Sequence, residues 1–269
     1  MSTHPLWKYL RPNALPHFFC PGCGAAQVLN FFLRAADEVQ LDFDKFVGIG
    51  GVGCAARIPV YLHAECLHGV HGRTIPWATG IKLHNPELNV VIFAGDGDAS
   101  AIGGGHLIHA CRRNLDVVMV VVNNLTFGMT GGQMAPTTPR NVKSATTPYG
   151  NVEDPFDICK LAETAGATYV ARWTTAKPKN AKNAIKEALD HKGFALVEIL
   201  TQCPTNFGRR ALSSGRAIDS LQWLKDHSVS QKKATGMRPE DLESKFVLGT
   251  FVKKTRPLFM GSSVYPKVP

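Results

Sequence analysis

Two oxygen-bearing side chains, each at the end of a hydrophobic run, are the first candidates for chemistry. Asp96 follows NVVIFAG in the stretch AGDGDAS, and Asn124 is the second residue of the pair NN that follows DVVMVVV. Carboxylate and amide oxygens are hard ligands suited to Mg²⁺, which usually completes its shell with water and substrate phosphates. If the two side chains meet, a diphosphate bound through Mg²⁺ is implied.

The two hydrophobic runs are predicted to be neighbouring strands of a parallel sheet. Both are rich in β-branched residues and too short for buried helices, as expected of strands covered on both faces. A crossover helix over residues 100–113 would bring their carboxyl ends to one edge, where open α/β sheets bind ligands. Gly95 and Gly97 let the backbone approach a ligand, and the helix that follows offers its N-terminal amides to phosphate. The alternative is an ordinary turn in which a polar residue after Gly97 caps the helix.

The rest of the chain alternates between helical and strand patterns. Helices are predicted over residues 23–39, 155–167 and 178–193, the last two capped by Gly166 and Gly193, and strands over 45–49, 168–173 and 194–201. This alternation is typical of an α/β fold with a doubly wound, mostly parallel sheet and right-handed crossovers.

Composition divides the chain and excludes some classes of protein. Residues 1–224 are predicted to form one α/β domain, and residues 225–269 a basic extension on another surface that contacts a further subunit, with nine Lys/Arg against four Asp/Glu. A partly disordered tail is the alternative. The net charge is +9, but no basic stripe interleaved with aromatic residues indicates nucleic-acid binding. No apolar run is long enough to cross a membrane, so we expect a cytoplasmic protein.

Four of the seven cysteines are candidates for metal binding. Cys20 and Cys23 form the motif CPGC, whereas Cys54 and Cys203 stand alone in GGVGCAAR and TQCPTN. A zinc site usually has two paired knuckles, and a redox dithiol needs only the first pair. Four thiolates from separate loops suit a [4Fe–4S] cluster, which takes one cysteine per iron. Two other cysteines occupy apolar helix positions and are predicted to be core residues: Cys111 and Cys159.

The segments around both candidate sites resemble a known family. GDGDASAIGGGHLIHACRRN and NNLTFGMTGGQMAPTT are similar to the β subunit of 2-oxoacid:ferredoxin oxidoreductases, and the likeness covers residues 18–210. The resemblance implies thiamine diphosphate (TPP) and Mg²⁺ bound by Asp96, Asn124 and the backbone carbonyl of Thr126. It also implies a [4Fe–4S] cluster on Cys20, Cys23, Cys54 and Cys203. It further implies cofactor contacts from Gly53, Cys54, Ala55, His71, Gly95, Gly97, Asp98, Gly128 and Met129.

The same resemblance implies an activity. GGQMAPTT and CPTNFGRR look more like the 2-oxoglutarate group than the pyruvate group. We therefore expect oxidative decarboxylation of 2-oxoglutarate with coenzyme A, giving succinyl-CoA, CO₂ and electrons that pass through the cluster to ferredoxin, or the reverse carboxylation. Pyruvate and branched-chain acids remain alternatives. By resemblance an α subunit supplies the activating Glu and much of the coenzyme A site, so the isolated chain is expected to be inactive.

Several other patterns compete with this interpretation. GIGGVG at residues 48–53 matches a dinucleotide-binding fingerprint, but Pro59 falls where an uninterrupted helix would be needed. A non-catalytic iron–sulfur electron-transfer protein would need the cysteines alone, with GDGD as an ordinary turn. Arg57 and Arg73 could pair with a substrate carboxylate or the diphosphate, or form surface salt bridges. His106 and His109 share one helix face, but no carboxylate motif accompanies them.

Overall fold

The computed structural model describes residues 4–259, within which eight strands form one sheet in the order β2-β1-β3-β4-β6-β5-β8-β7. All neighbouring strands pair in parallel except β5 and β8, which are antiparallel. The predicted mostly parallel α/β fold is thus confirmed. The central strands are β1 (Phe46–Gly50), β3 (Asn89–Gly95), β4 (Val118–Asn123), β6 (Ala195–Leu200) and β5 (Tyr169–Thr174).

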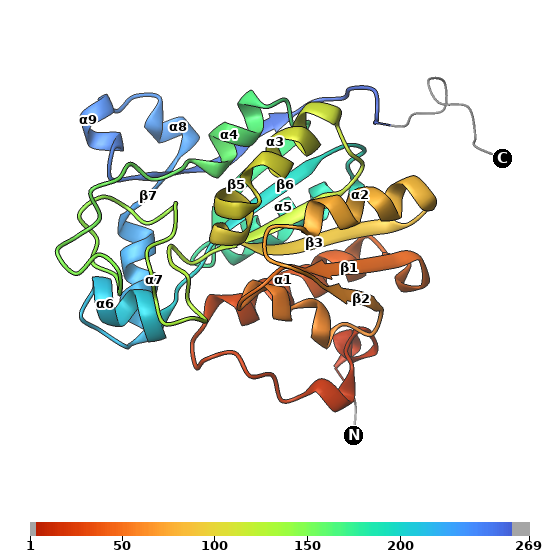
Figure 1. The fold of residues 1–269 in the computed structure, drawn as a ribbon, viewed down its shortest axis with the longest axis horizontal. Helices are drawn as coiled ribbons and strands as arrows, with labels where there is room; N and C mark the ends of the chain where they lie inside the picture. Colours follow the sequence, from red (N-terminus) through yellow and green to blue (C-terminus); the bar gives the residue numbers. More distant parts are fainter. Residues whose placement is uncertain (1–3, 260–269) are drawn as a thin grey trace.

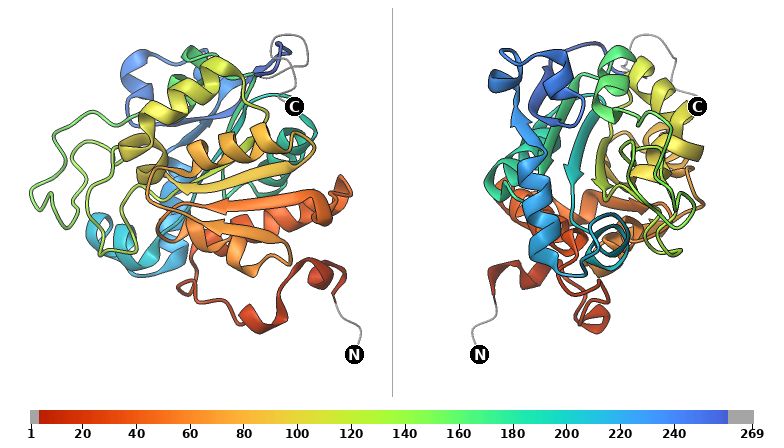
Figure 2. Two further views of the ribbon diagram at one scale, coloured as in Figure 1. Left: turned by 45° about the vertical axis from the view of Figure 1, so that its right-hand side comes forward. Right: turned by 90° about the vertical axis from the view of Figure 1, so that its left-hand side faces the viewer.

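Helices cover both faces of this sheet (Figures 1 and 2). Side chains alternate along β3, where Val91 and Phe93 join one buried apolar cluster and Val90 and Ile92 join the other. This division explains the uninterrupted apolar runs, because a strand with two buried faces has no side for polar residues. On one face lie α1 (Gly24–Glu38) and α5 (Pro178–Asp190), and on the other α2 (Thr74–His84), α3 (Gly104–Arg113) and α4 (Ile158–Thr164).

The predicted elements are mostly in place, but two helices differ from expectation. The stretch predicted as one helix over residues 100–113 is a π-helical turn, Asp98–Ile102, followed by α3. Single π turns occur frequently at functional sites. The helix predicted to be capped by Gly193 ends earlier, because α5 is followed by His191 as its C-cap. Gly193, with φ +119°, instead forms the turn into β6.

Several elements were not predicted. These are β2 (Glu65–His68), β7 (Ser228–Ser230), β8 (Phe246–Lys253), α2, α6 (Arg209–Ala211), α7 (Ala217–Asp226), α8 (Gln231–Ala234) and α9 (Pro239–Leu242). There are also 3₁₀ turns at Pro5–Tyr9, Pro12–Ala14, Phe43–Lys45, Ala55–Arg57 and Pro59–Tyr61, and a π turn at Pro204–Gly208. The fingerprint GIGGVG is thus followed by two short turns rather than the helix that dinucleotide binding requires.

The basic C-terminal segment contributes a strand to the sheet. Its strand β8 pairs with β5 and extends the sheet. Beyond β8, Arg256 donates through Nη2 to the carbonyls of Cys111 and Arg112, both at 2.8 Å. The described part of this segment is therefore part of the α/β fold, whereas residues 260–269 lie outside the described residues.

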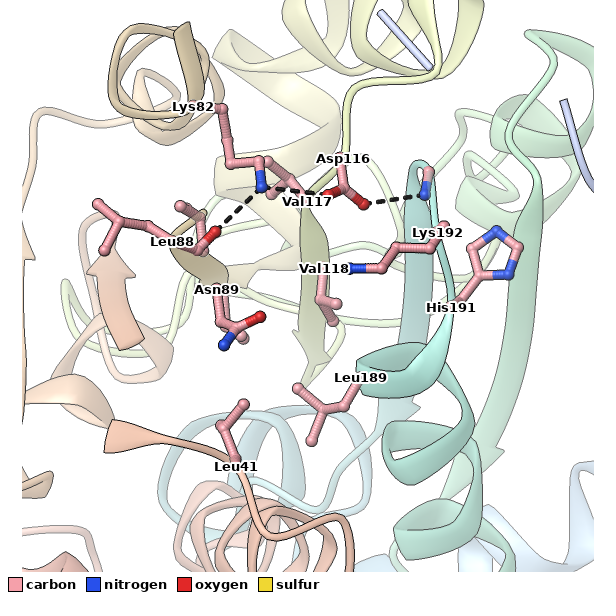
Figure 3. Close-up of a pocket in the computed structure, with 13 residues that line it drawn as sticks. Leu41, Lys82, Leu88, Asn89, Asp116, Val117, Val118, Leu189, His191 and Lys192 are labelled. Carbon is pink, nitrogen blue, oxygen red and sulfur yellow. Dashed lines mark hydrogen bonds and ion pairs between the residues drawn. The ribbon is translucent and has the colours of Figure 1, made fainter. Parts of the chain in front are cut away.

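The amino ends of the strands are closed by a buried ion pair (Figure 3). Lys82 Nζ lies 3.1 Å from Asp116 Oδ2 and donates to the carbonyls of Pro86 and Leu88. Gly193 N donates to the other oxygen of Asp116. The remaining cavity measures about 30 Å³, the share of one water molecule in the liquid.

No helix within residues 4–259 has the length and apolar content needed to span a bilayer.

Candidate functional site

The carboxyl ends of strands β3 and β4 bring Asp96 and Asn124 together, as predicted. β3 ends at Gly95 and β4 at Asn123, and Gly95 pairs with Val122 in the parallel register, so the next residues of both strands leave the sheet side by side. The amide group of Asn124 lies 3.2 Å from Asp96 Oδ1 and 2.6 Å from the carbonyl oxygen of Thr126.

The atoms of this cluster fit a divalent cation. In one orientation the Asn124 amide oxygen, which accepts from Thr126 N (3.3 Å), faces both the Asp96 carboxylate and the Thr126 carbonyl. Three oxygens without a proton between them repel one another unless a cation lies among them. In the reverse orientation the amide nitrogen would donate to both oxygens. Carboxylate, amide and backbone carbonyl oxygens are the donors that Mg²⁺ and Ca²⁺ use in proteins.

Burial makes the negative charge of the Asp96 carboxylate unfavourable unless a proton or a cation is bound. Asp96 is 2% exposed, and its side chain accepts one hydrogen bond from Thr137 Oγ1 at 2.5 Å. Loss of solvation raises the pKa of Asp96 to about 7, and the negative charge of Glu198 also acts to raise it. A hydroxyl donor does not offset the carboxylate charge, so the group either keeps a proton or binds a cation.

The second aspartate of GDGD has a different role. The Asp98 carboxylate accepts from Gly72 N (2.6 Å) and Val52 N (3.3 Å), and His71 Nδ1 contacts it directly. Asp98 therefore joins the turn after β1 to the loop that carries His71. A Cβ atom at Gly51 would lie 1.5 Å from Asp98 Oδ2, which explains the glycine there. Since both oxygens of this carboxylate already have partners, any contact of Asp98 with a diphosphate would have to come from its backbone.

Close packing across the site explains a second glycine. A Cβ atom at Gly97 would lie 2.1 Å from the ring of Phe127, so only glycine permits this approach. Phe127 also packs edge-on against the ring of His71, with centroids 6.0 Å apart. Its backbone closes the loop after β4, because Phe127 N donates to Gln133 O and Gly132 N donates to Phe127 O. Two of the residues predicted to contact the cofactor, Gly97 and His71, thus flank one aromatic ring.

The four predicted cluster cysteines lie near one another. Burial raises the pKa of Cys23 to about 12, with smaller contributions from the charges of Cys203, Cys54 and Cys20. Gly24 N donates to Gln202 O at 2.9 Å, which joins the CPGC segment to the segment of Cys203. Burial likewise raises the pKa of Cys54 to about 11. Thiols in such a site become thiolates only if a metal supplies positive charge.

Zinc and a [4Fe–4S] cluster make different demands on the positions of these thiols. Among residues 4–259, no three His, Cys, Asp or Glu side chains are placed to bind one metal ion. A zinc ion with bonds of about 2.3 Å requires its sulfurs close together. A cube of four irons holds one cysteine per iron and spaces the sulfurs more widely. The four cysteines supply the number of thiolates that a [4Fe–4S] cluster takes.

Gly128 connects the thiol group to the oxygen group. A Cβ atom at this residue would lie 3.1 Å from Asn124 Nδ2, 3.8 Å from Cys203 Sγ and 3.9 Å from Cys54 Sγ. Asn206 Nδ2 donates to Gly128 O at 2.6 Å and holds it against the segment after Cys203. In Figure 1 the loop over residues 124–157 lies beside α6 and α7 at this end of the sheet. The oxygen group and the thiol group thus share Gly128 as a neighbour.

Other predicted residues have mixed outcomes. Gly53, with φ +102°, has open space around it, Ala55 is buried beside Cys54, and Met129 is 45% exposed. Arg73 donates to the carbonyls of Gly72 and Ile102, so it supports the His71 loop. The guanidinium of Arg57 lies over the ring of Phe18. Cys111 and Cys159 are buried, as predicted.

Sequence reasoning missed the residues that support the site from behind. Thr137 bonds Asp96, while Asn123 and Glu198 bond each other at 2.7 Å, all in buried positions. Asn123 had a signal, because it is the first member of the NN pair. Thr137 and Glu198 had none, since they come from an irregular loop and an apolar strand.

Several known proteins are similar in sequence to this chain. The family described as "Thiamine pyrophosphate enzyme, C-terminal TPP binding domain" matches residues 49–199. The chain is 48% identical to 2-oxoglutarate synthase subunit KorB of Methanocaldococcus jannaschii over 257 residues, which cover 96% of this chain and 95% of that protein. It is 56% identical to subunit KorB of Archaeoglobus fulgidus over 198 residues, 74% of each protein.

A solved structure is similar over almost the whole chain. The 2-oxoglutarate:ferredoxin oxidoreductase from Magnetococcus marinus, with 2-oxoglutarate, coenzyme A and succinyl-CoA bound, superposes with a TM-score of 0.83 at 34% identity. The match covers 96% of this chain and 88% of that one.

Proposed function

Because the chain belongs to the KorB family of 2-oxoglutarate synthase subunits, within the thiamine pyrophosphate enzymes, we propose that it is the TPP-binding β subunit of a 2-oxoglutarate:ferredoxin oxidoreductase. The observation that carries the proposal is the cluster of oxygens from Asp96, Asn124 and Thr126 beside the thiols of Cys54 and Cys203. The proposed reaction converts 2-oxoglutarate and coenzyme A to succinyl-CoA, CO₂, a proton and two electrons, or runs in reverse.

Each group of residues has a defined part in this proposal. Asp96, Asn124 and the Thr126 carbonyl would hold Mg²⁺, and through it the diphosphate, at the edge of the sheet. Cys20, Cys23, Cys54 and Cys203 would hold a [4Fe–4S] cluster. When bound, TPP supplies the electron sink for decarboxylation, and the cluster accepts electrons one at a time. This chain's own residues orient both groups and keep them adjacent across Gly128.

The proposed partners follow from the relatives and from charge. The relatives are named as subunits, so we propose that an α subunit completes the TPP and coenzyme A sites. In the proposed reaction the electron acceptor is ferredoxin, which is an acidic protein. The net charge of +9 on this chain would favour its electrostatic docking. The rival function, a non-catalytic electron carrier, would leave the cluster of oxygens around Asp96 without a role.

Replacement of a proposed cluster ligand tests this function. We expect the complex purified without oxygen to contain iron, sulfide and thiamine, and to give the EPR signal of a reduced [4Fe–4S] cluster. Cys203→Ser should lose the signal and most of the iron while retaining thiamine, because the oxygen ligands are untouched. The matched control is Cys111→Ser, a substitution of another buried thiol away from the site. Equal iron content in the two variants would refute the assignment of Cys203.

A further inference from the structure

A row of buried polar side chains, to which the proposed function gives no role, runs from Asp96 into the sheet. Thr137 Oγ1 donates to Asp96 Oδ2 at 2.5 Å and lies 3.3 Å from Asn123 Oδ1. Asn123 Nδ2 donates to Glu198 Oε1 at 2.7 Å. Arg172 Nε donates to Glu198 Oε2 at 2.6 Å. These residues come from the loop after β4 and from β4, β6 and β5, so the row of side chains crosses three adjacent strands.

Stability alone does not explain this chain of contacts. Its residues are almost inaccessible to solvent: Thr137 and Asn123 are 2% exposed, Glu198 1% and Arg172 5%. Replacing a buried ion pair by apolar residues is often neutral or stabilising, because the charges lose their hydration. A network retained in the centre of an otherwise apolar sheet therefore indicates a role in fixing geometry.

Thr137 determines which oxygen of Asp96 is free. Its hydroxyl occupies Oδ2, and this leaves Oδ1 facing the amide of Asn124, which also lies against the carbonyl of Thr126. Without the hydroxyl the carboxylate can rotate about its last bond and turn either oxygen toward these groups. The hydrogen bond thus holds the carboxylate plane in the orientation that a cation shared with Asn124 and Thr126 requires.

Asn123 holds the turn that supplies the other two oxygens. Its Oδ1 accepts from Leu125 N at 3.0 Å. Leu125 has φ +62°, a left-handed conformation that is unfavourable for a branched side chain. This conformation turns the Thr126 carbonyl back toward the Asn124 side chain. Glu198, paired with Arg172, fixes the Asn123 amide in the orientation that supports the turn.

We propose that Thr137 and Asn123, anchored by the Glu198–Arg172 ion pair, are positioning residues that pre-arrange the three oxygen ligands of the divalent cation. The inference rests on the proposed function, since it assumes that Asp96, Asn124 and Thr126 bind that cation. Residues that orient metal ligands in this way typically contribute 10-fold to 100-fold to metal affinity.

Titration of Mg²⁺ into the complex at saturating TPP, followed by calorimetry, tests this inference. We expect Thr137→Val to raise the Kd for Mg²⁺ about 10-fold to 100-fold. Thr137→Ser keeps the hydroxyl and should restore affinity close to that of the wild type. The matched control is Thr168→Val, which removes a buried hydroxyl bonded to Asn114 Oδ1 at the opposite end of the sheet. It should leave Mg²⁺ affinity unchanged although it also loses a buried hydrogen bond.

Two outcomes would overturn the inference: a Thr137→Val variant that binds Mg²⁺ like Thr168→Val, or a loss of affinity that Thr137→Ser does not restore. If Thr137→Val does not fold, Thr137→Ala takes its place with the same expectation. Asp96→Ala distinguishes the two levels of the proposal. An unchanged Mg²⁺ affinity in Asp96→Ala would refute the proposed function. A loss of affinity in Asp96→Ala but not in Thr137→Val would refute only the positioning role.

Discussion

A carboxylate buried as deeply as Asp96 competes for a proton and a cation at the same oxygens. Loss of solvation raises the pKa of Asp96 to about 7, so the cofactor-free site holds a proton that an unfolded chain would release. A divalent ion reverses this preference, because it becomes the largest charge in the site. Proton release and cation binding should therefore be linked.

The pH dependence of stability follows from this linkage. Between about pH 4 and pH 7 the folded, cofactor-free chain binds a proton at Asp96 that the unfolded chain has lost, so this group makes stability fall as pH rises. Mg²⁺ with TPP displaces the proton, and its stabilising effect should therefore grow from pH 6 to pH 8. Melting temperatures with and without Mg²⁺ and TPP measure the effect. An equal shift at both pH values would contradict the assignment of Asp96.

At this scale the sequence predicted that Asp96 and Asn124 meet, but not which residues support them. Asp96 and Asn124 were predictable because each follows an apolar strand with a recognisable motif, and the cysteines because the family resemblance selected them. Thr137 was not predictable, since it lies 41 residues from its partner Asp96 in an irregular loop. The bond between Asp98 and the His71 loop was equally hidden, because no periodicity links positions 27 residues apart.

At the scale of elements, buried strands were predictable and edge elements were not. β3 and β4 are covered on both faces, and their unbroken apolar runs identify them. β2 is a short edge strand whose residues are mostly exposed, so its sequence ECLH carries no alternation. β8 was missed because Gly249 interrupts its pattern and its pairing with β5 is antiparallel. Such pairings depend on tertiary packing that local sequence does not encode.

The ion pair that crosses β5 and β6 should be important for stability. Arg172 and Glu198 are 6% and 2% exposed at their side chains. Arg172→Leu leaves the Glu198 carboxylate buried and unpaired, which we expect to cost about 3–5 kcal/mol of unfolding free energy. Arg238→Leu is the control, because its pair with Asp241 is largely exposed and is worth at most about 1 kcal/mol. Denaturant unfolding measures the unfolding free energy of both variants. Similar losses would show that the buried Arg172–Glu198 pair contributes no more to stability than an exposed pair.

At the scale of the whole molecule, the two ends of the sheet have different roles. The amino end is sealed by Lys82 and Asp116, whereas the carboxyl end collects the oxygens and thiols. Both faces are covered by helices (Figure 2), so the cofactor that we propose at the carboxyl end would be held at one end of this fold. The other part of the cofactor would then need a second protein surface.

Isolated chain should consequently bind Mg²⁺ and TPP weakly and show no turnover. We expect activity with 2-oxoglutarate, coenzyme A and a viologen dye only when the α subunit is present, because that subunit supplies the proposed activating Glu. In the complete complex, 2-oxoglutarate should react faster than pyruvate. Turnover by the purified chain alone would refute the need for a partner, and faster pyruvate turnover would refute the proposed substrate.

The central claim is that Asp96 and Asn124 hold the cation that anchors TPP, and calorimetry of the complex tests it most directly. TPP titrated with Mg²⁺ present should bind to the wild type and to Asp116→Asn, whose aspartate belongs to the sealed amino end of the sheet. Asp96→Ala should abolish measurable binding while the complex stays assembled. Tight, Mg²⁺-dependent binding of TPP to Asp96→Ala would contradict the account.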